Sequence, residues 1–400
     1  MNEIIVKKIK EILDTIIKNK NLTNNNIGLL GGKSGEVMFY LYYADFFNDS
    51  TYYEKGLSLL EKIFDEISDG YSYPTFCVGI AGVGWAVEHL AQNNFIETNT
   101  NETLGNIDTY LASKMLYDLE KNNNYDFLHG AIGIGIYFLN HLSNTKSKKY
   151  LIQLIDKLER QSIEEKDGAL KWESVVQDIN EQPKKVFNLS LSHGIASIVA
   201  FLAKAYTYGV YKEKVKPMLE NAVKYILKQK LNPNIYGSYF PSWICNDEPV
   251  SKSRLAWCYG DLGIAVTIYQ AGKALNNKEW EQIAIEVLLH ASNRRDLEKE
   301  FVVDACLCHG TASMSHIFNR MYRNTGIEKF KETSKFWLNE TLKMAKFEDG
   351  LAGYKTWFGE KHGGWKKEYG ILEGIAGTGL VLISAISDKE SKWDECLLLS

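Results

Sequence analysis

The sequence has few prolines and few cysteines, and it carries no excess of charge of either sign. Among its 400 residues there are 6 Pro and 6 Cys, and 46 Lys plus Arg balance 50 Asp plus Glu to a formal charge of −4. The low proline content excludes a Pro-rich disordered chain, and six scattered cysteines are too few for a disulfide scaffold. The balanced charge gives no global electrostatic reason to bind nucleic acid or an anionic membrane.

Long hydrophobic runs are missing as well, and no apolar stretch reaches the length of a transmembrane helix. Residues 1–20 carry lysines between regularly spaced isoleucines, which predicts an amphipathic helix and not a signal peptide. We therefore expect a cytoplasmic protein with reduced thiols and no stable membrane insertion. The sequence is 45% apolar and 12% aromatic, enough for a sizeable core. The isoleucines of the expected helix are Ile5, Ile9, Ile12 and Ile16.

A short glycine motif recurs seven times along the chain. Each copy is Gly-x-x-Gly or Gly-x-x-Ser followed by apolar residues, and the first glycines are 47 to 66 residues apart. Each interval accommodates two helices and their connections. The motif predicts the start of a buried helix, and segments such as 51–67 and 211–229 have the apolar spacing of amphipathic outer helices. The first glycines are Gly32, Gly79, Gly130, Gly194, Gly260, Gly310 and Gly374.

The repeats predict an all-α fold in a single domain over residues 1–400. Alternating β-branched runs bounded by turn signals are scarce, which argues against a major sheet. An open solenoid needs polar caps at its ends, whereas the first and seventh motifs are as regular as the others. We therefore expect a closed α/α toroid of seven inner and seven outer helices, with the motifs gathered at one end of a central cavity. Three Asn-rich segments, 21–26, 97–103 and 121–126, are expected to be surface loops.

Residues with reactive side chains concentrate immediately before the first glycine of the motifs. Cys258 and the adjacent pair Cys308 and His309 offer two thiolates and one imidazole, the ligand number of a catalytic zinc that keeps its fourth position open. Sulfur donors favour zinc over magnesium or calcium. An isolated cysteine is more commonly a small buried hydrophobe, but the shared repeat register favours the metal. We expect packing roles for the other four cysteines, Cys77, Cys245, Cys306 and Cys396.

The flanking sequences WCYGDLG, LCHGTAS, LSHGIAS and LEGIAGTGL resemble the lanthionine synthetase C-like family, which includes the cyclases of lanthipeptide biosynthesis. The likeness covers all seven motifs and implies an α/α toroid with one Zn²⁺ bound by Cys258, Cys308 and His309. There are departures: Ser197 and Ser313 replace the second glycine of two motifs. Other active-site positions of the family fall on Asp126, His193, Arg254, Trp257 and Tyr259.

The resemblance implies the addition of a cysteine thiol to a dehydroalanine or dehydrobutyrine of the same peptide. The metal acidifies the thiol, and the enolate formed by the addition takes a proton at its α-carbon. His193 is the best candidate acid, because an imidazole titrates near neutrality. Arg254 is a candidate to stabilise the enolate or to orient a peptide carbonyl. Asp126 either orients His193 or pairs with Arg254, and the sequence does not choose between them.

Four further residues have weaker assignments. Tyr259 is a candidate donor to the enolate, although packing is almost as good an explanation for an aromatic residue there. Trp257 is expected to form a wall of the cavity. Glu373 and His129 each stand immediately before the first glycine of a motif, and we expect both to line the cavity. His129 stands where relatives often carry Glu.

Three other functions compete with the cyclase hypothesis. A relative that adds glutathione or another thiol to dehydro-residues would have the same metal site. A zinc prenyltransferase subunit also combines helical hairpins with a zinc-activated thiolate, but the WCYG and CHG motifs disfavour it. In a peptide-binding module with a structural zinc, His193, Arg254 and Asp126 would have no role.

The resemblance also implies partners. These are a dehydrated ribosomal precursor peptide with its leader, a separate dehydratase, and an exporter with which the protein would associate transiently at the membrane. No nucleic acid is expected among the partners.

Overall fold

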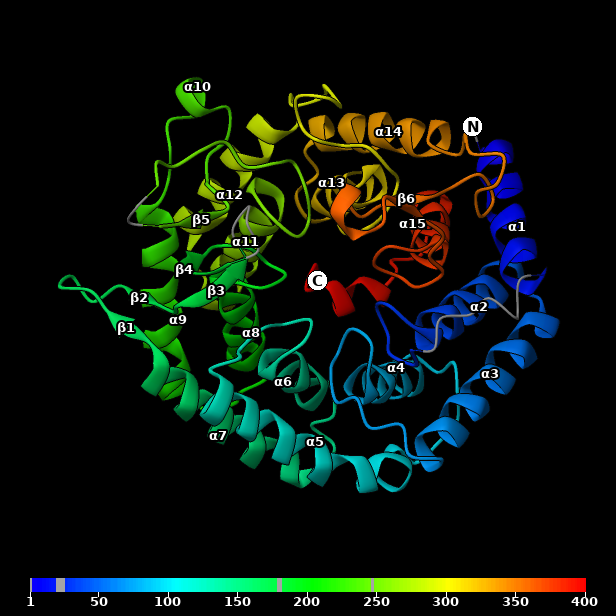
Figure 1. Ribbon diagram of the computed structural model, residues 1–400, viewed down its shortest axis with the longest axis horizontal. Coiled ribbons are helices and arrows are strands. Elements are labelled where there is room, and N and C mark those ends of the chain that lie inside the picture. The colour runs from blue at the N-terminus through cyan, green and yellow to red at the C-terminus, as the bar shows by residue number, and fades with distance from the viewer. Residues whose placement is uncertain (1, 19–25, 178–181, 246–247) are drawn as a thin grey trace. The chain divides into compact units, whose positions relative to one another are not determined.

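The computed structural model describes residues 2–18, 26–177, 182–245 and 248–400, mostly as helices (Figure 1). These residues form two compact units. Unit 1 comprises Met1–Ile107 and Asp296–Leu397, and unit 2 comprises Asp108–Arg295 and Leu398–Ser400. Among the described residues, no helix combines the length and the apolar character needed to cross a membrane.

All seven glycine motifs begin a helix, as the sequence predicts. The first glycine of each motif is the N-cap residue, and the helix starts at the next residue. These motif helices are buried over most of their length. Most of them are apolar on several sides, whereas the one that follows Gly310 also buries polar residues such as Ser315 and His316. They are α2 (Lys33–Phe47), α4 (Ile80–Gln92), α6 (Ala131–Asn140), α8 (Ile195–Thr207), α11 (Asp261–Leu275), α13 (Thr311–Thr325) and α15 (Ile375–Ile386).

Close backbone approach explains the small residues of the motif. A Cβ atom at Gly194 would lie 2.3 Å from the carbonyl oxygen of Asn188, so no larger residue fits there. Three residues later, Ser197 takes the place of the second glycine, and its hydroxyl donates to the carbonyl oxygen of Gly194 at 2.7 Å. Ser313 makes the same bond to Gly310 at 2.9 Å. The serines therefore fit the motif by satisfying the N-cap carbonyl group.

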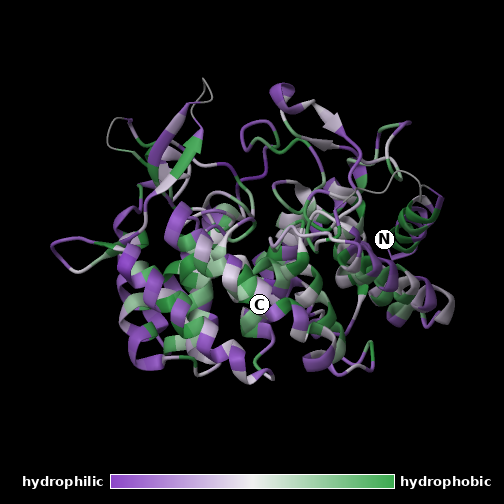
Figure 2. Cartoon of the chain, turned by 60° about the horizontal axis from the view of Figure 1, so that its bottom comes forward, coloured by the Kyte–Doolittle hydropathy of each residue, from purple (hydrophilic) through white to green (hydrophobic). Residues whose placement is uncertain are grey.

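Seven other helices bury one face each, and six of them pack against a motif helix. Figure 2 shows helices that carry both purple, hydrophilic residues and green, hydrophobic residues. The expected N-terminal helix and the helices expected over 51–67 and 211–229 are all present. The isoleucines of the N-terminal helix are buried, as predicted. The seven other helices are α1 (Asn2–Lys18), α3 (Ser50–Ser68), α5 (Thr100–Asn122), α7 (Thr145–Gln161), α9 (Lys212–Lys228), α12 (Lys278–Ala291) and α14 (Glu328–Lys343).

Two of the loop predictions are wrong in part. The segment 97–103 is not wholly a loop, because α5 begins at Thr100 and carries Glu102 in its first turn, where a carboxylate favours a helix. The segment 121–126 contains the end of α5 and then a loop. Most of the segment 21–26 lies outside the described residues.

Helices that follow one another along the chain pack together within each unit. In unit 1, α13 contacts α15, α15 contacts α2, and α2 contacts α4. Helix α1 packs against α15, so the first and last α-helices of the chain meet in unit 1. In unit 2, α6 contacts α8 and α8 contacts α11, and α7, α9 and α12 cover these three motif helices.

Small sheets connect some of the helices, and no large sheet occurs among the described residues, in line with the sequence. One antiparallel sheet has the strand order β3-β4-β5, and in it Asn188 pairs with Trp243. This pairing matters for the site, because Asn188 begins the loop that leads to α8. The strands are β1 (Ile163–Glu164), β2 (Leu170–Lys171), β3 (Ser174–Gln177), β4 (Pro183–Asn188), β5 (Trp243–Ile244), β6 (Thr356–Trp357) and β7 (Trp365–Lys366); three short helices are α10 (Pro233–Tyr236), η2 (Glu360–His362) and η3 (Trp393–Leu397).

Candidate functional site

The loops before several motif helices share one turn. Six residues before the first glycine, the side-chain oxygens of Asn124, Asn188 and Asp304 accept the backbone N–H two residues later, at 3.2, 2.9 and 3.1 Å. This is the Asx turn that Asn and Asp favour. This position was not among those predicted from the sequence, although its polar residues are visible when the repeats are aligned.

Backbone hydrogen bonds also join neighbouring loops at the position two residues before the glycine. In unit 1, the N–H of Cys308 donates to Leu372 at 2.9 Å, Leu372 donates to Leu30 at 2.8 Å, and Leu30 donates to Cys77 at 3.0 Å. The carbonyl oxygen of Cys258 in unit 2 accepts from Leu191 at 3.1 Å. The backbone at these positions is therefore fixed. Cys77 is buried here, which agrees with its expected packing role.

Asp126 and His193 form a close pair in unit 2. Oδ2 of Asp126 lies 2.6 Å from Nδ1 of His193, and Oδ1 accepts the backbone N–H of His129 at 2.8 Å. Burial favours the neutral carboxyl group, but the bonds from His193 and His129 outweigh it and hold the pKa of Asp126 below its ordinary value. Of the two partners that the sequence left open for Asp126, the structure places His193 in hydrogen-bonding contact.

Aromatic rings lie next to His193. The ring of His129 is nearly parallel to that of His193, with centroids 6.4 Å apart, and Tyr259 lies 6.1 Å away on the same measure. The Tyr259 hydroxyl accepts from the side-chain amide of Asn188 at 3.4 Å. Burial raises the pKa of Tyr259 to about 12, so its phenol keeps its proton at neutral pH. Burial also lowers the pKa of His129.

The segment before α11 is held by a backbone conformation that favours glycine. Gly260 has a φ of 99°, and a Cβ atom there would lie 2.2 Å from the carbonyl oxygen of Arg254. This fixes the course of the preceding residues, including Cys258 and Tyr259. Arg254 is half-buried in the same loop. Trp257 is fully buried, with its ring centroid 6.4 Å from that of Phe127, which fits a packing role; its place among the site residues stays a prediction.

Cys308 and His309 stand directly before Gly310 in unit 1, and both are half-buried. Nε2 of His309 lies 3.4 Å from Oδ2 of Asp304, whose side chain is fully buried. Burial opposes ionisation of Asp304, but His309 and the backbone N–H groups of Trp357 and Cys306 hold its pKa below the ordinary value. Asp304 was not among the residues expected from the sequence. Glu373 is half-buried before α15.

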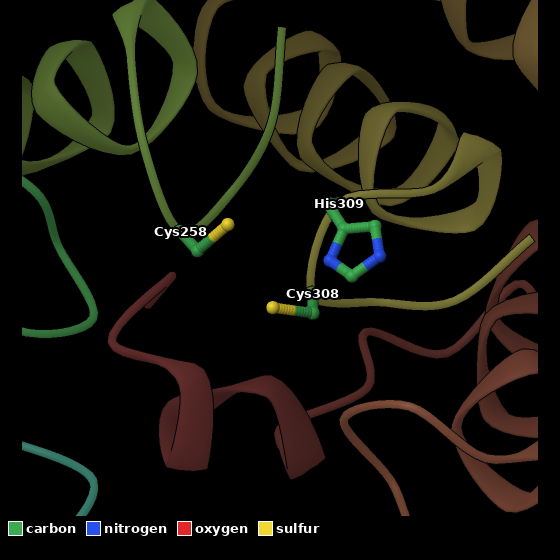
Figure 3. A group of neighbouring side chains, drawn as sticks. All are labelled: Cys258, Cys308 and His309. Carbon is green, nitrogen blue, oxygen red and sulfur yellow. The ribbon is translucent and has the colours of Figure 1, made fainter. Parts of the chain in front are cut away.

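Two groups of metal-ligating side chains occur among the described residues. One is Cys258, Cys308 and His309, and the other is Asp304, Cys306 and His309; in each, the ligand atoms lie within 4.8 Å of one another. Figure 3 shows the first group. Cysteine sulfur and histidine nitrogen are the donors that zinc prefers in proteins.

The chemistry of Cys306 separates the two groups. Cys306 is buried, and burial, followed by the nearby Asp304 carboxylate, raises the pKa of its thiol to about 11. In that second group both Asp304 and Cys306 are buried, whereas in the first group Cys308 and His309 are half-buried and therefore more open to an ion and its fourth ligand. The first group is the better donor set, because it offers two sulfurs and an imidazole.

Comparisons with known proteins cover nearly the whole chain. The family model described as lanthionine synthetase C-like protein matches residues 23–398. Nisin biosynthesis protein NisC of Lactococcus lactis subsp. lactis is 24% identical, and the alignment covers 98% of this chain and 96% of NisC. A solved structure of nisin cyclase matches with a TM-score of 0.78 at 21% identity, covering 99% of this chain and 97% of that one. This likeness confirms the predicted fold class, an all-α protein of the α/α-toroid type.

Proposed function

Because the chain belongs to the lanthionine synthetase C-like family, we propose that it is a cyclase that closes lanthionine or methyllanthionine rings in a dehydrated precursor peptide. The observation that carries the proposal is the match to NisC and to nisin cyclase over almost the full length of each. We treat residues 1–400 as one catalytic domain, because the family model spans both units. A separate dehydratase would supply the substrate, its leader would help to hold it, and an exporter would receive the product.

We infer that Cys258, Cys308 and His309 hold a zinc ion. The donor set supports this, since two sulfurs and an imidazole suit zinc and leave a fourth position for a ligand. When bound, zinc would lower the pKa of the substrate cysteine thiol while its two sulfur ligands keep that sulfur nucleophilic.

His193 would move the proton. The Asp126 carboxylate accepts the hydrogen on Nδ1 of His193, which leaves Nε2 as the nitrogen for proton exchange with the substrate. During ring closure the thiol sulfur bonds to the β-carbon, and the electrons of the carbon–carbon double bond pass to the enolate. His193 takes up the thiol proton and delivers it to the α-carbon, so the peptide is isomerised and its mass does not change. Asp126 stabilises the imidazolium ion between these two transfers.

Tyr259 and Arg254 would act on the enolate. The Tyr259 phenol is protonated at neutral pH and lies beside His193, so it can donate a hydrogen bond to the enolate oxygen. Arg254 carries a permanent positive charge in the same segment. His129 and Glu373 remain lining residues in this scheme.

The cyclase activity can be tested with a dehydrated precursor peptide. The purified protein should make the cysteine thiols of the peptide resistant to alkylation without any change in peptide mass. With glutathione present, a mass increase equal to one glutathione per site would instead support the alternative enzyme that adds an external thiol. Thiols that stay as reactive as in an enzyme-free sample would contradict the cyclase activity. If, in addition, the peptide gains no mass with glutathione present, both activities are contradicted and a peptide-binding module is favoured.

The zinc site has its own test. Wild-type protein should contain about one zinc per chain by elemental analysis, and Cys258→Ala or Cys308→Ala should lose most of it. Cys306→Ala is the matched control, because it removes a buried cysteine from the other metal-ligating group. Loss of zinc in Cys306→Ala but not in Cys308→Ala would move the ion to that second group and contradict the assignment.

A further inference from the structure

Asp304 has a negative charge and a second carboxylate oxygen that the turn in its loop does not require. Its Oδ1 accepts the backbone N–H of Cys306 at 3.1 Å, as the amide oxygens of Asn124 and Asn188 do in the loops before α6 and α8. Those two loops make the turn with a neutral asparagine. The turn before α13 therefore does not need the negative charge or the second oxygen of an aspartate.

The second oxygen faces two N–H donors. Oδ2 of Asp304 accepts the backbone N–H of Trp357 at 2.9 Å and lies 3.4 Å from Nε2 of His309. The Asp304 side chain has no exposed surface and that of His309 is 15% exposed, so water does not compete strongly for the carboxylate. A buried carboxylate is costly unless donors surround it, and a hydrogen on Nε2 supplies one.

This contact decides which nitrogen of His309 is available to a metal ion. A neutral imidazole carries one hydrogen, and a carboxylate beside Nε2 places that hydrogen there, which leaves the lone pair on Nδ1. Figure 3 shows one ring nitrogen of His309 on the side of the cysteine sulfurs and the other on the opposite side. Carboxylates that hold the second nitrogen of a metal-bound histidine orient the ring and increase its basicity.

We propose that Asp304 is a positioning residue for the metal site: its Oδ2 holds Nε2 of His309, so that Nδ1 is presented to the ion. This inference rests on the proposed zinc site. It also gives Asp304 a role other than that of a ligand in the second metal-ligating group, since its two oxygens are already engaged by Cys306, Trp357 and His309.

Asp304→Asn is the matched substitution, because asparagine makes the same turn in the loops before α6 and α8. Zinc affinity should be measured by competition with a chromophoric chelator for wild type, Asp304→Asn, His309→Ala and the double variant. We expect Asp304→Asn to weaken zinc binding about 10- to 100-fold in the wild-type background. In the His309→Ala background it should weaken binding less than about threefold, because the residue through which Asp304 acts is gone.

Two results would overturn the proposal: unchanged zinc affinity in Asp304→Asn, or an equal loss in both backgrounds, which would indicate a general structural effect. A second measurement uses the wild-type protein alone and does not depend on folding of the variant. In zinc-loaded protein with ¹⁵N-labelled histidine, NMR should find the hydrogen of His309 on Nε2, and a hydrogen on Nδ1 would contradict the proposal. Wild-type protein that binds no zinc would instead refute the proposed metal site itself.

Discussion

Replacing Asp126 by asparagine tests the proposed proton transfer most sharply. The wild-type carboxylate lies 2.6 Å from Nδ1 of His193, and the side chains of Asp126 and His193 are 20% and 33% exposed. Asparagine keeps an oxygen for the backbone N–H of His129 but turns an N–H group toward His193. The imidazole must then place its hydrogen on Nε2, the nitrogen that should accept the thiol proton.

The size of the effect follows from the bond that is lost. A hydrogen bond to a charged group contributes about 1.5–3 kcal/mol. Because both side chains are partly exposed, we expect the lower half of this range, or a ring-closure rate about 10- to 50-fold slower. The pKa of Asp126 is lowered, so its charge is complete above the ordinary aspartate pKa and is lost only as the pH falls through the lowered value. Asp126 therefore stays charged between about pH 6 and 8, so the assay compares a charged with a neutral partner of His193 throughout this range.

The assay follows alkylatable thiols in a dehydrated peptide over time, with an enzyme-free sample for spontaneous closure. Asp167→Asn is the control, because Asp167 is an exposed carboxylate that pairs with Lys228 at 2.9 Å and was not assigned to the site. Asp126→Asn should also keep wild-type zinc content. A ring-closure rate equal to that of Asp167→Asn would refute the role of the Asp126–His193 pair.

Three further predictions concern the stability of the fold. In thermal melts, Gly260→Ala should destabilise the protein by about 1–3 kcal/mol, because φ is 99° and the new Cβ would meet a backbone oxygen; it should also reduce the zinc content. Gly105→Ala in α5 is the control, because a Cβ there meets nothing within 4 Å, and it should be neutral or slightly stabilising. Burial raises the pKa of Glu36 to about 7 from its ordinary 4.5, so the fold loses stability as the pH rises through this window. The free energy of unfolding of Glu36→Gln should therefore increase relative to that of wild type as the pH rises from 4.5 to 7, by at most roughly 3 kcal/mol. A difference that does not change with pH would contradict this. Asp394 is buried and holds Arg320 through bonds of 2.7 and 2.9 Å, so Asp394→Asn should cost about 3 kcal/mol in denaturant unfolding, and a loss below 1 kcal/mol would count against the pair.

The motif helices could be predicted from the sequence because each begins at a glycine that the backbone requires. The register of the repeats also brought out Cys258, Cys308 and His309 as candidate ligands. These signals are local: they depend on a residue's distance from one glycine and on the apolar residues that follow.

Other parts of the site depend on how separate loops pack, which local signals do not contain. The sequence left Asp126 with two possible partners, because contact between loops 67 residues apart is decided by the packing of α6 against α8. The full burial of Trp257 is likewise set by its neighbours. Asp304 was missed for a different reason. Other repeats have a neutral asparagine at the same position, six residues before the glycine, where it makes only the turn, so the sequence did not indicate a role for the charge of Asp304. The start of α5 was missed because Asn and Thr favour both loops and helix N-termini.

The most direct test of the proposed function compares one protein sample with and without its metal. Protein stripped by a chelator and then exchanged into metal-free buffer should leave the thiols of a dehydrated peptide alkylatable at the enzyme-free rate. Restoring about one zinc per chain should return thiol loss at constant peptide mass, and should fail to do so in Cys308→Ala. Ring closure at the full rate in protein shown to contain no metal would contradict the account.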